Sequence, residues 1–120
     1  MPELALERLD MQARHLALLR ELLHQHLPQA EVWAYGSRVN GDGQEASDLD
    51  LVVRQPADPK QETPALWEVK EALVESNLPI RVDVVDWAHI PASFHREIER
   101  AYVVVQTGSG GKTGGLGNGG

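Results

Sequence analysis

The sequence contains no cysteine among its 120 residues. A disulfide framework and a thiolate metal site are therefore excluded, and a chain without disulfides fits the cytoplasm. No apolar run approaches the ~20 residues that cross a bilayer, so we expect no membrane association. The first residues, Met1 to Glu3, also lack the basic and apolar regions of a signal peptide.

Basic residues are also few: 11 Lys and Arg stand against 18 Asp and Glu, and the formal net charge is −7. Proteins that bind nucleic acid through their surface field need clustered Lys and Arg, so direct binding to nucleic acid is not expected. A single nucleotide held through a metal ion is compatible with this charge.

Glycine is scarce in residues 1–107, where it occurs only at Gly36, Gly41 and Gly43. The other eight glycines follow from Gly108 to the last residue. A segment of that composition buries too little apolar surface to offset its ordering entropy. We therefore expect one folded domain over residues 1–107 and a disordered glycine-rich tail over residues 108–120.

Hydrophobic periodicity predicts an α+β fold, in which helices pack on a small mixed β-sheet. The expected helices cover residues 3–27, 63–77 and 93–100. The expected strands cover residues 31–35, 49–54, 80–86 and 102–105. The second strand is almost entirely apolar and should be central, whereas the last is expected at an edge of the sheet.

Two details of the packing follow from single residues. The middle helix is expected to begin with Thr63 as its N-cap and Pro64 at the first helical position. Its inward face should carry Leu66, Val69, Leu73 and Val74. The three tryptophans, Trp33, Trp67 and Trp87, are expected in the core or at a subunit contact rather than as stacking platforms for adenine.

The main chemical signal is a Gly36-Ser37 turn that stands ten residues ahead of the triplet Asp48-Leu49-Asp50. Residues two apart on a strand point to the same face, so Asp48 and Asp50 should stand side by side. Two such charges repel each other unless a cation lies between them or one of them takes up a proton. A glycine turn that presents N–H groups to phosphate, next to paired carboxylates, indicates nucleotide chemistry.

A third carboxylate is expected on the strand at residues 80–86. If this strand neighbours residues 49–54, Asp83 joins Asp48 and Asp50 on one face, although Asp86 lies only three residues away and stays an alternative. Three carboxylates can hold two Mg²⁺ ions, which stabilise the attacking and leaving oxygens of a displacement at phosphorus.

Taken together, these motifs resemble the nucleotidyltransferase superfamily that includes DNA polymerase β and the aminoglycoside nucleotidyltransferases. The resemblance extends over about residues 16–105, and the short length is similar to that of the minimal nucleotidyltransferase (MNT) proteins. It implies a polymerase β-like nucleotidyltransferase fold.

The resemblance also implies a role for each site residue. Gly36 and Ser37 would hold the triphosphate of ATP, and Arg38 would either touch phosphate or form a structural salt bridge. Asp48 and Asp50 would bind both Mg²⁺ ions. Asp83 would bind the catalytic metal and help to deprotonate the acceptor hydroxyl.

MNT proteins are encoded beside HEPN-domain partners, with which they form toxin–antitoxin pairs. The resemblance implies that this chain is the antitoxin, a protein adenylyltransferase that transfers AMP from ATP to a tyrosine of the HEPN ribonuclease toxin. A hetero-oligomer with that toxin is implied too, because no second domain is expected after residue 105 to shape the acceptor site.

Two alternatives remain open from the sequence. In one, the chemistry is the same but the acceptor is a small molecule, which the expected lack of a second domain disfavours. In the other, the chain is a non-catalytic antitoxin that neutralises its partner by covering it, with a vestigial site. The presence of all three acids, Asp48, Asp50 and Asp83, favours an active enzyme.

Overall fold

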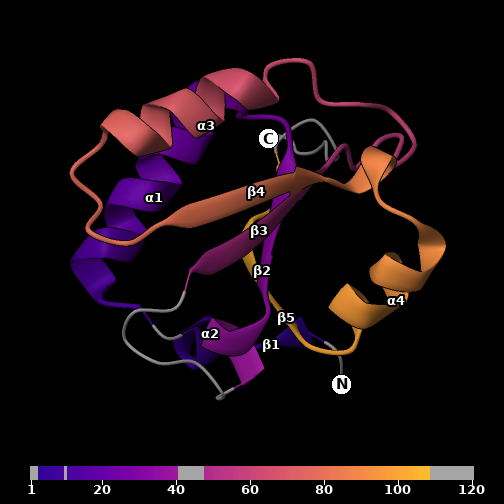
Figure 1. Cartoon of the computed structure of the whole chain (residues 1–120), viewed down its shortest axis with the longest axis horizontal. Coiled ribbons are helices and arrows are strands. Elements are labelled where there is room, and N and C mark those ends of the chain that lie inside the picture. Colours follow the sequence, from indigo (N-terminus) through magenta and orange to yellow (C-terminus); the bar gives the residue numbers. More distant parts are fainter. Residues whose placement is uncertain (1–2, 10, 41–47, 109–120) are drawn as a thin grey trace, which may run out of the picture.

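The computed structural model describes residues 3–9, 11–40 and 48–108 (Figure 1). Its helices and strands, in chain order, are β1 (Glu3–Leu4), a 3-10 helix η1 (Leu6–Arg8), α1 (Ala13–His26), β2 (Glu31–Tyr35), α2 (Ser37–Asn40), β3 (Leu49–Arg54), α3 (Leu66–Glu75), β4 (Val82–Asp86), a 3-10 helix η2 (Trp87–His89), α4 (Ala92–Glu99) and β5 (Tyr102–Gln106).

The strands form one mixed sheet in the order β1-β5-β2-β3-β4. The strands β2 and β3 are antiparallel, as are β2 and β5, whereas β3 pairs with β4 and β1 pairs with β5 in parallel. The expected α+β fold with a small mixed sheet is confirmed. No helix in the described residues is long and apolar enough to span a membrane.

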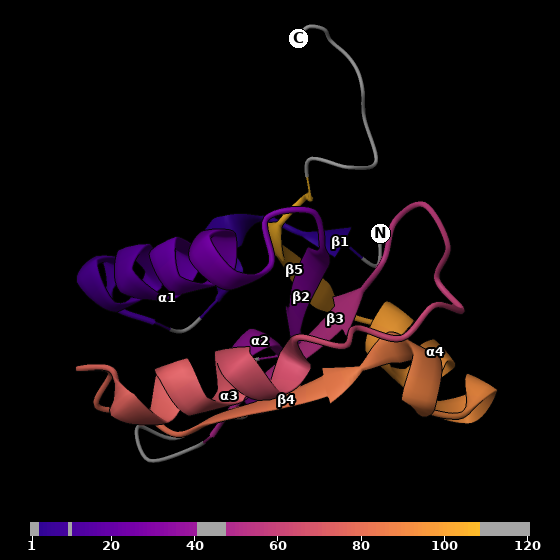
Figure 2. The same ribbon diagram turned by 90° about the horizontal axis from the view of Figure 1, so that it is seen from above.

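The sheet carries a hydrophobic cluster on each face. Figure 2 shows α1 and α3 together on one side of the strands and α4 on the other. The larger cluster joins α1 and α3 to the sheet, and the smaller one is built around Trp33, Val52, Trp87 and Ile98. Because both faces of β3 are covered, Leu49 and residues 51–53 are fully buried. The prediction that this strand is central is confirmed.

The expected helix over residues 3–27 was wrong in its first ten residues, since α1 begins only at Ala13. Before it, Glu3 and Leu4 pair with β5, and η1 follows. Leu4 and Leu6 are two residues apart, which would turn them about 200° apart on a helix. As a strand and a 3-10 turn, the segment instead packs both side chains against the main core.

The helix α3 also begins later than expected, at Leu66, so Thr63 is not its N-cap. Thr63 is buried before the helix, where its backbone N–H is bonded to Asp86. Val74 was wrongly placed on the inward face and is 84% exposed. It follows Leu73, which is buried, so it is turned about 100° away from the helix face that packs on the core.

The expectation of an edge position for residues 102–105 was also wrong. The strand β5 lies between β1 and β2, and its buried residues alternate along its length. A two-residue β1 provides the outer neighbour, and a pairing of two residues leaves no periodic signal in the sequence. The first tail residue, Gly108, is buried at a φ of 75°, where a Cβ would lie 2.8 Å from the Gln29 carbonyl oxygen. The remaining tail lies outside the described residues.

Candidate active site

Three side chains from three adjacent strands lie in a row across one end of the sheet. Tyr35, the last residue of β2, is paired with Asp50 of β3, and Asp50 is paired with Asp83 of β4. Paired strands are about 4.7–4.9 Å apart, so the two carboxylates are neighbours on one face. We call Tyr35, Asp50 and Asp83 the site row. The expected juxtaposition of Asp83 and Asp50 is confirmed.

The other paired acid, Asp48, lies next to this row. It is exposed and directly precedes the first residue of β3. It lies two positions before Asp50, with only Leu49 between them, and this spacing directs both side chains to one side of the chain. Three carboxylates thus gather at the end of β3 where the strand begins.

Gly36 brings the backbone of the predicted phosphate turn against this group. Its φ is 84°, a conformation that glycine adopts freely and other residues adopt at a cost. A Cβ on Gly36 would lie 2.5 Å from Oδ2 of Asp50. The expected Gly-Ser turn leads directly into the one-turn helix α2, and the backbone N–H of Val39 donates to the Gly36 carbonyl at 3.0 Å. The Gly36 turn is therefore packed against the carboxylate of Asp50.

Negative charge concentrates at the site row. The pKa of Asp50 is raised by burial first, then by the charges of Asp83 and Asp48. The pKa of Tyr35 is raised to about 12 by burial, then by Asp50 and Asp83, so its phenol stays protonated at neutral pH. Burial is the main cause of both shifts, and the neighbouring carboxylates add to each of them, a repulsion that a bound cation would relieve.

Arg38, expected either at phosphate or in a salt bridge, is buried at 6% exposure and is held by interactions within the protein. Its contact with phosphate remains a prediction. The remaining loop glycines, Gly41 and Gly43, lie outside the described residues.

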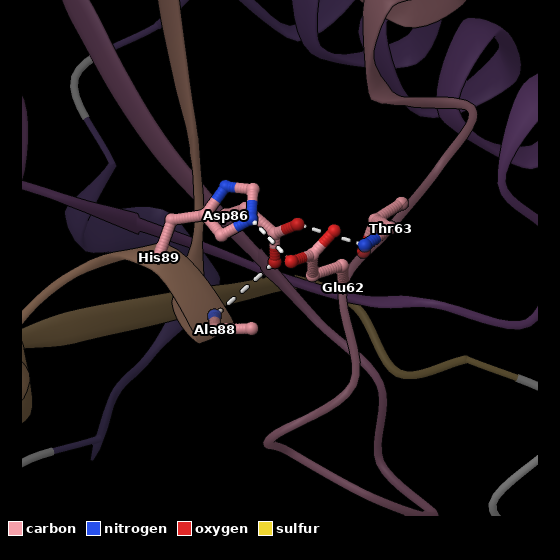
Figure 3. Close-up of polar contacts among 5 residues, drawn as sticks. All are labelled: Glu62, Thr63, Asp86, Ala88 and His89. Atoms are coloured by element: carbon pink, nitrogen blue, oxygen red, sulfur yellow. Dashed lines mark hydrogen bonds and ion pairs between the residues drawn. The ribbon is translucent and has the colours of Figure 1, made fainter.

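Asp86, the alternative third carboxylate, is buried at 3% exposure. Its Oδ2 accepts a hydrogen bond from the Thr63 N–H at 2.7 Å, and its Oδ1 accepts one from the Ala88 N–H at 3.2 Å. Figure 3 shows both bonds, with the exposed ion pair between Glu62 and His89 beside them. Both oxygens of the Asp86 carboxylate therefore accept hydrogen bonds from backbone N–H groups.

The register of the sheet thus distinguishes Asp83 from Asp86, the two acids between which the sequence did not decide. Asp83 is exposed on the edge strand and lies beside Asp50. Asp86 is three residues further on and therefore points to the opposite face. Geometry favours Asp83 as the third member of the acidic group.

The carboxylates of the site suit a hard divalent cation that is shared with substrate and water. No group of three or more His, Asp or Glu side chains within the described ranges is arranged to hold a metal ion by itself. Mg²⁺ commonly takes one or two carboxylates and completes its shell with water and substrate phosphates. The oxygen donors and the unrelieved negative potential at Asp50 suit such a shared site.

Asp50→Asn is expected to raise the melting temperature of the protein in EDTA at pH 7. A carboxyl group whose folded pKa is raised lowers stability when ionised, at pH values above its ordinary pKa, and the penalty disappears at acid pH. Since Asp50 is only half-buried, we expect a gain below ~1 kcal/mol, or a few degrees. Thermal denaturation beside an Asp58→Asn control measures it, and a lower melting temperature than wild type would contradict the repulsion.

Gly36→Ala is expected to disable the site without unfolding the chain. The left-handed φ costs an alanine roughly 1–2 kcal/mol, and its methyl group displaces the Asp50 carboxylate. We expect loss of nucleotide-dependent thermal stabilisation in the presence of Mg²⁺. Ala34→Gly, in the neighbouring strand, is the control for backbone changes alone, and nucleotide binding equal to wild type in the Gly36→Ala protein would refute the assignment.

One member of the site row, Tyr35, was not expected beside the carboxylates from the sequence. The available signal was its position immediately before Gly36, at the end of a strand that is antiparallel to the Asp50 strand. Only the register between those strands places its ring opposite Asp50. The ring also makes an edge contact with Phe94 of α4, with centroids 5.7 Å apart.

Comparisons with known proteins identify the family of this chain and proteins similar to it. Residues 16–105 match the family described as the nucleotidyltransferase domain. The chain is 42% identical over 101 residues to the probable protein adenylyltransferase MntA of Haemophilus influenzae. The aligned residues cover 82% of this chain and 85% of that protein. Among solved structures, it is similar to a toxin–antitoxin crystallised with AMP-PNP, with a TM-score of 0.61 and 23% identity over 80% of this chain and 74% of the other. The second likeness concerns the fold alone.

Proposed function

This chain belongs to the minimal nucleotidyltransferase family and is a nucleotidyltransferase, and from that premise we propose that it transfers AMP from ATP to a partner protein. The observation that carries the proposal is the site row, in which the register of β3 and β4 sets Asp83 beside Asp50. Two acids on paired strands, with a glycine turn packed on one of them, make a site for phosphoryl chemistry.

In this proposal, Gly36 and Ser37 bind the triphosphate, with Arg38 beside them. Asp48 and Asp50 would hold two Mg²⁺ ions, with Asp83 on the catalytic one. Bound Mg²⁺ supplies charge neutralisation at the departing pyrophosphate and lowers the pKa of the incoming hydroxyl.

The transfer itself is a displacement at the α-phosphorus of ATP. The acceptor oxygen forms a bond to this phosphorus, and the bond from phosphorus to the oxygen that bridges to the β-phosphate breaks. Pyrophosphate leaves with that electron pair, and the Asp83 carboxylate takes the proton of the hydroxyl. Asp48 and Asp50 keep the reacting groups aligned.

The identity of the acceptor forms the finer part of the proposal. We infer that it is a tyrosine of a HEPN-domain toxin, that the two proteins form a hetero-oligomer, and that this chain is the antitoxin. The name of the Haemophilus relative, a probable protein adenylyltransferase, supports a protein acceptor. A cytoplasmic location belongs to the same proposal, because ATP is abundant there and the chain has no cysteine.

The test is to combine the purified chain with the product of the adjacent reading frame, ATP and Mg²⁺, and to measure the intact mass of both proteins. We expect the partner to gain one or more AMP units. The double substitution of Asp48 and Asp50 with alanine should abolish the gain, whereas Asp58→Ala, which changes an exposed aspartate elsewhere, should leave it intact.

Two other outcomes decide between the alternative functions. A double variant that still neutralises the partner, while wild type leaves the partner unmodified, would establish neutralisation by covering. AMP on an added small molecule but never on the protein partner would establish a small-molecule acceptor.

A further inference from the structure

A groove opens between α3 and the first part of β4. It has a volume of about 410 Å³. Its walls are formed by α3, by the segment that enters β4, and by β4 itself, and its lining includes Lys70, Val74, Leu78, Ile80, Arg81 and Asp83. Asp83 lines the edge of the groove, but its side chain points with that of Val85 to the α4 face of the sheet, whereas Val82 and Val84 face the groove and α3. Figure 2 shows α3 running alongside β4.

The strand β4 is the last in the sheet, so only β3 pairs with it. An edge strand directs a row of N–H and C=O groups away from its neighbour, and an added strand can satisfy them. The exposure of Asp83 is consistent with this open edge. The described part of the chain contributes no strand to the outer side of β4.

The order of the strands also fixes the side from which an acceptor can arrive. Gly36 follows β2 on the inner side of Asp50, and Asp83 lies on the outer side in β4. In an in-line displacement, the attacking and leaving oxygens lie on opposite sides of the phosphorus. If the triphosphate is held at Gly36, the acceptor hydroxyl must approach past Asp83, at the open edge of β4. A strand added to this edge directs alternate side chains to the two faces of the sheet, so one can lie in the groove while the next reaches Asp83.

The groove wall is suited to a polypeptide segment. Val74 is 84% exposed, and Leu78 and Ile80 are partly buried against the core. Lys70 and Arg81 add two cations, neither of which forms an ion pair with another described residue. In a protein of net charge −7, this local excess of positive charge favours an acidic side chain on the segment that binds here.

We propose that the groove between α3 and β4 is the docking site for an extended segment of the acceptor protein, which pairs with the outer edge of β4 and delivers its hydroxyl to Asp83. The segment carries apolar side chains for Val74 and Ile80 and an acidic side chain for Lys70 and Arg81. This inference rests on the proposed function and specifies how the acceptor protein is recognised.

The experiment uses two substitutions on the same helix. Val74→Glu places a charge in the groove, and Trp67→Glu places one at the other large exposed apolar residue of α3, which does not line the groove. Both sites are on the surface, so both variants should fold. The acceptor is the purified product of the adjacent reading frame, and its affinity is measured by calorimetry beside its rate of modification.

We expect Val74→Glu to weaken binding of the acceptor and raise its KM by about tenfold, which corresponds to about 1.4 kcal/mol, with kcat within about twofold of wild type. Trp67→Glu should bind and react as wild type does. Thermal stabilisation by ATP and Mg²⁺ should be equal in all three proteins, because the nucleotide lies on the inner side of the site row. Equal acceptor affinity in wild type and Val74→Glu, or a larger loss in Trp67→Glu, would overturn the proposal.

Hydrogen exchange tests strand addition directly and without catalysis. With acceptor protein bound, amide exchange in residues 82–86 should slow by more than tenfold, relative to the free chain, as edge N–H groups gain partners. Unchanged exchange at β4 in a formed complex would overturn the docking mode. A wild-type chain that protects β4 but transfers no AMP would refute the proposed reaction and retain the groove, so the two failures are distinguishable.

Discussion

Replacing Asp83 with Asn is expected to reduce the rate of AMP transfer by about 100- to 1,000-fold while leaving the fold intact. The asparagine side chain keeps the shape of the carboxylate but removes its charge. It can neither accept the acceptor's proton nor serve as an anionic ligand beside Asp50. Since Asp83 is exposed, the free energy of unfolding should change by less than about 0.5 kcal/mol.

The measurement is the initial rate of acceptor modification at saturating ATP, followed by intact mass, together with thermal denaturation. Asp58→Asn provides the matched control, because it makes the same change at an exposed aspartate distant in sequence from the site row. If Asp83→Asn reacted like wild type, Asp83 would not be the third carboxylate, and the acceptor hydroxyl would lose its assigned base.

Replacing Asp86 with Ala is expected to have the opposite profile, with a large loss of stability. The change removes both acceptors of the Thr63 and Ala88 N–H groups, one of them in a buried bond of 2.7 Å. A buried donor left unpaired costs about 1–3 kcal/mol, and the Ala88 N–H, in a half-buried bond, adds less, so we expect a total of ~2–4 kcal/mol. For a domain whose whole stability is about 5–15 kcal/mol, this is a large fraction.

Urea denaturation of the wild-type and variant proteins measures this change. The control is Asp58→Ala, because Asp58 also accepts a backbone hydrogen bond, from the Lys60 N–H at 3.2 Å, but does so at an exposed position. Water replaces a lost bond there, so the control should change stability by less than about 0.5 kcal/mol. Well below its melting temperature, the Asp86→Ala protein should still bind nucleotide. A stable variant without activity would reverse the roles of Asp83 and Asp86.

Much of the fold could be predicted because its strongest signals are local. The run of residues 49–54 is apolar enough to require cover on both faces, and β3 is indeed central. The helix α4 was expected within one residue of its bounds, because Pro91 marks its start. The helix expected from residue 3 could not be corrected from the sequence, because Glu3 and Leu4 form a strand only through pairing with the distant strand β5.

The candidate site, like the fold, could be predicted where its signals are local and not where they depend on strand pairing. The ten-residue spacing from Gly36-Ser37 to Asp48 and Asp50 is contiguous in sequence, and strand periodicity alone predicts two carboxylates on one side. The position of Tyr35 opposite Asp50 depends on the antiparallel register of two strands separated by the loop. That register could not be predicted, because the strands do not meet in a short hairpin of defined turn type.

By itself, the sequence determined the class of chemistry: a glycine turn near a pair of carboxylates, in an acidic chain without cysteine. The tertiary structure decided which acid lies beside Asp50, since parallel pairing of β3 and β4 aligns Asp83 with Asp50, whereas Asp86 accepts hydrogen bonds from two backbone N–H groups. It also decided that β4, rather than β5, lies at the edge beside the site. The physical reason is that side-chain period along a strand is a local property, whereas register and strand order are set by contacts between distant segments.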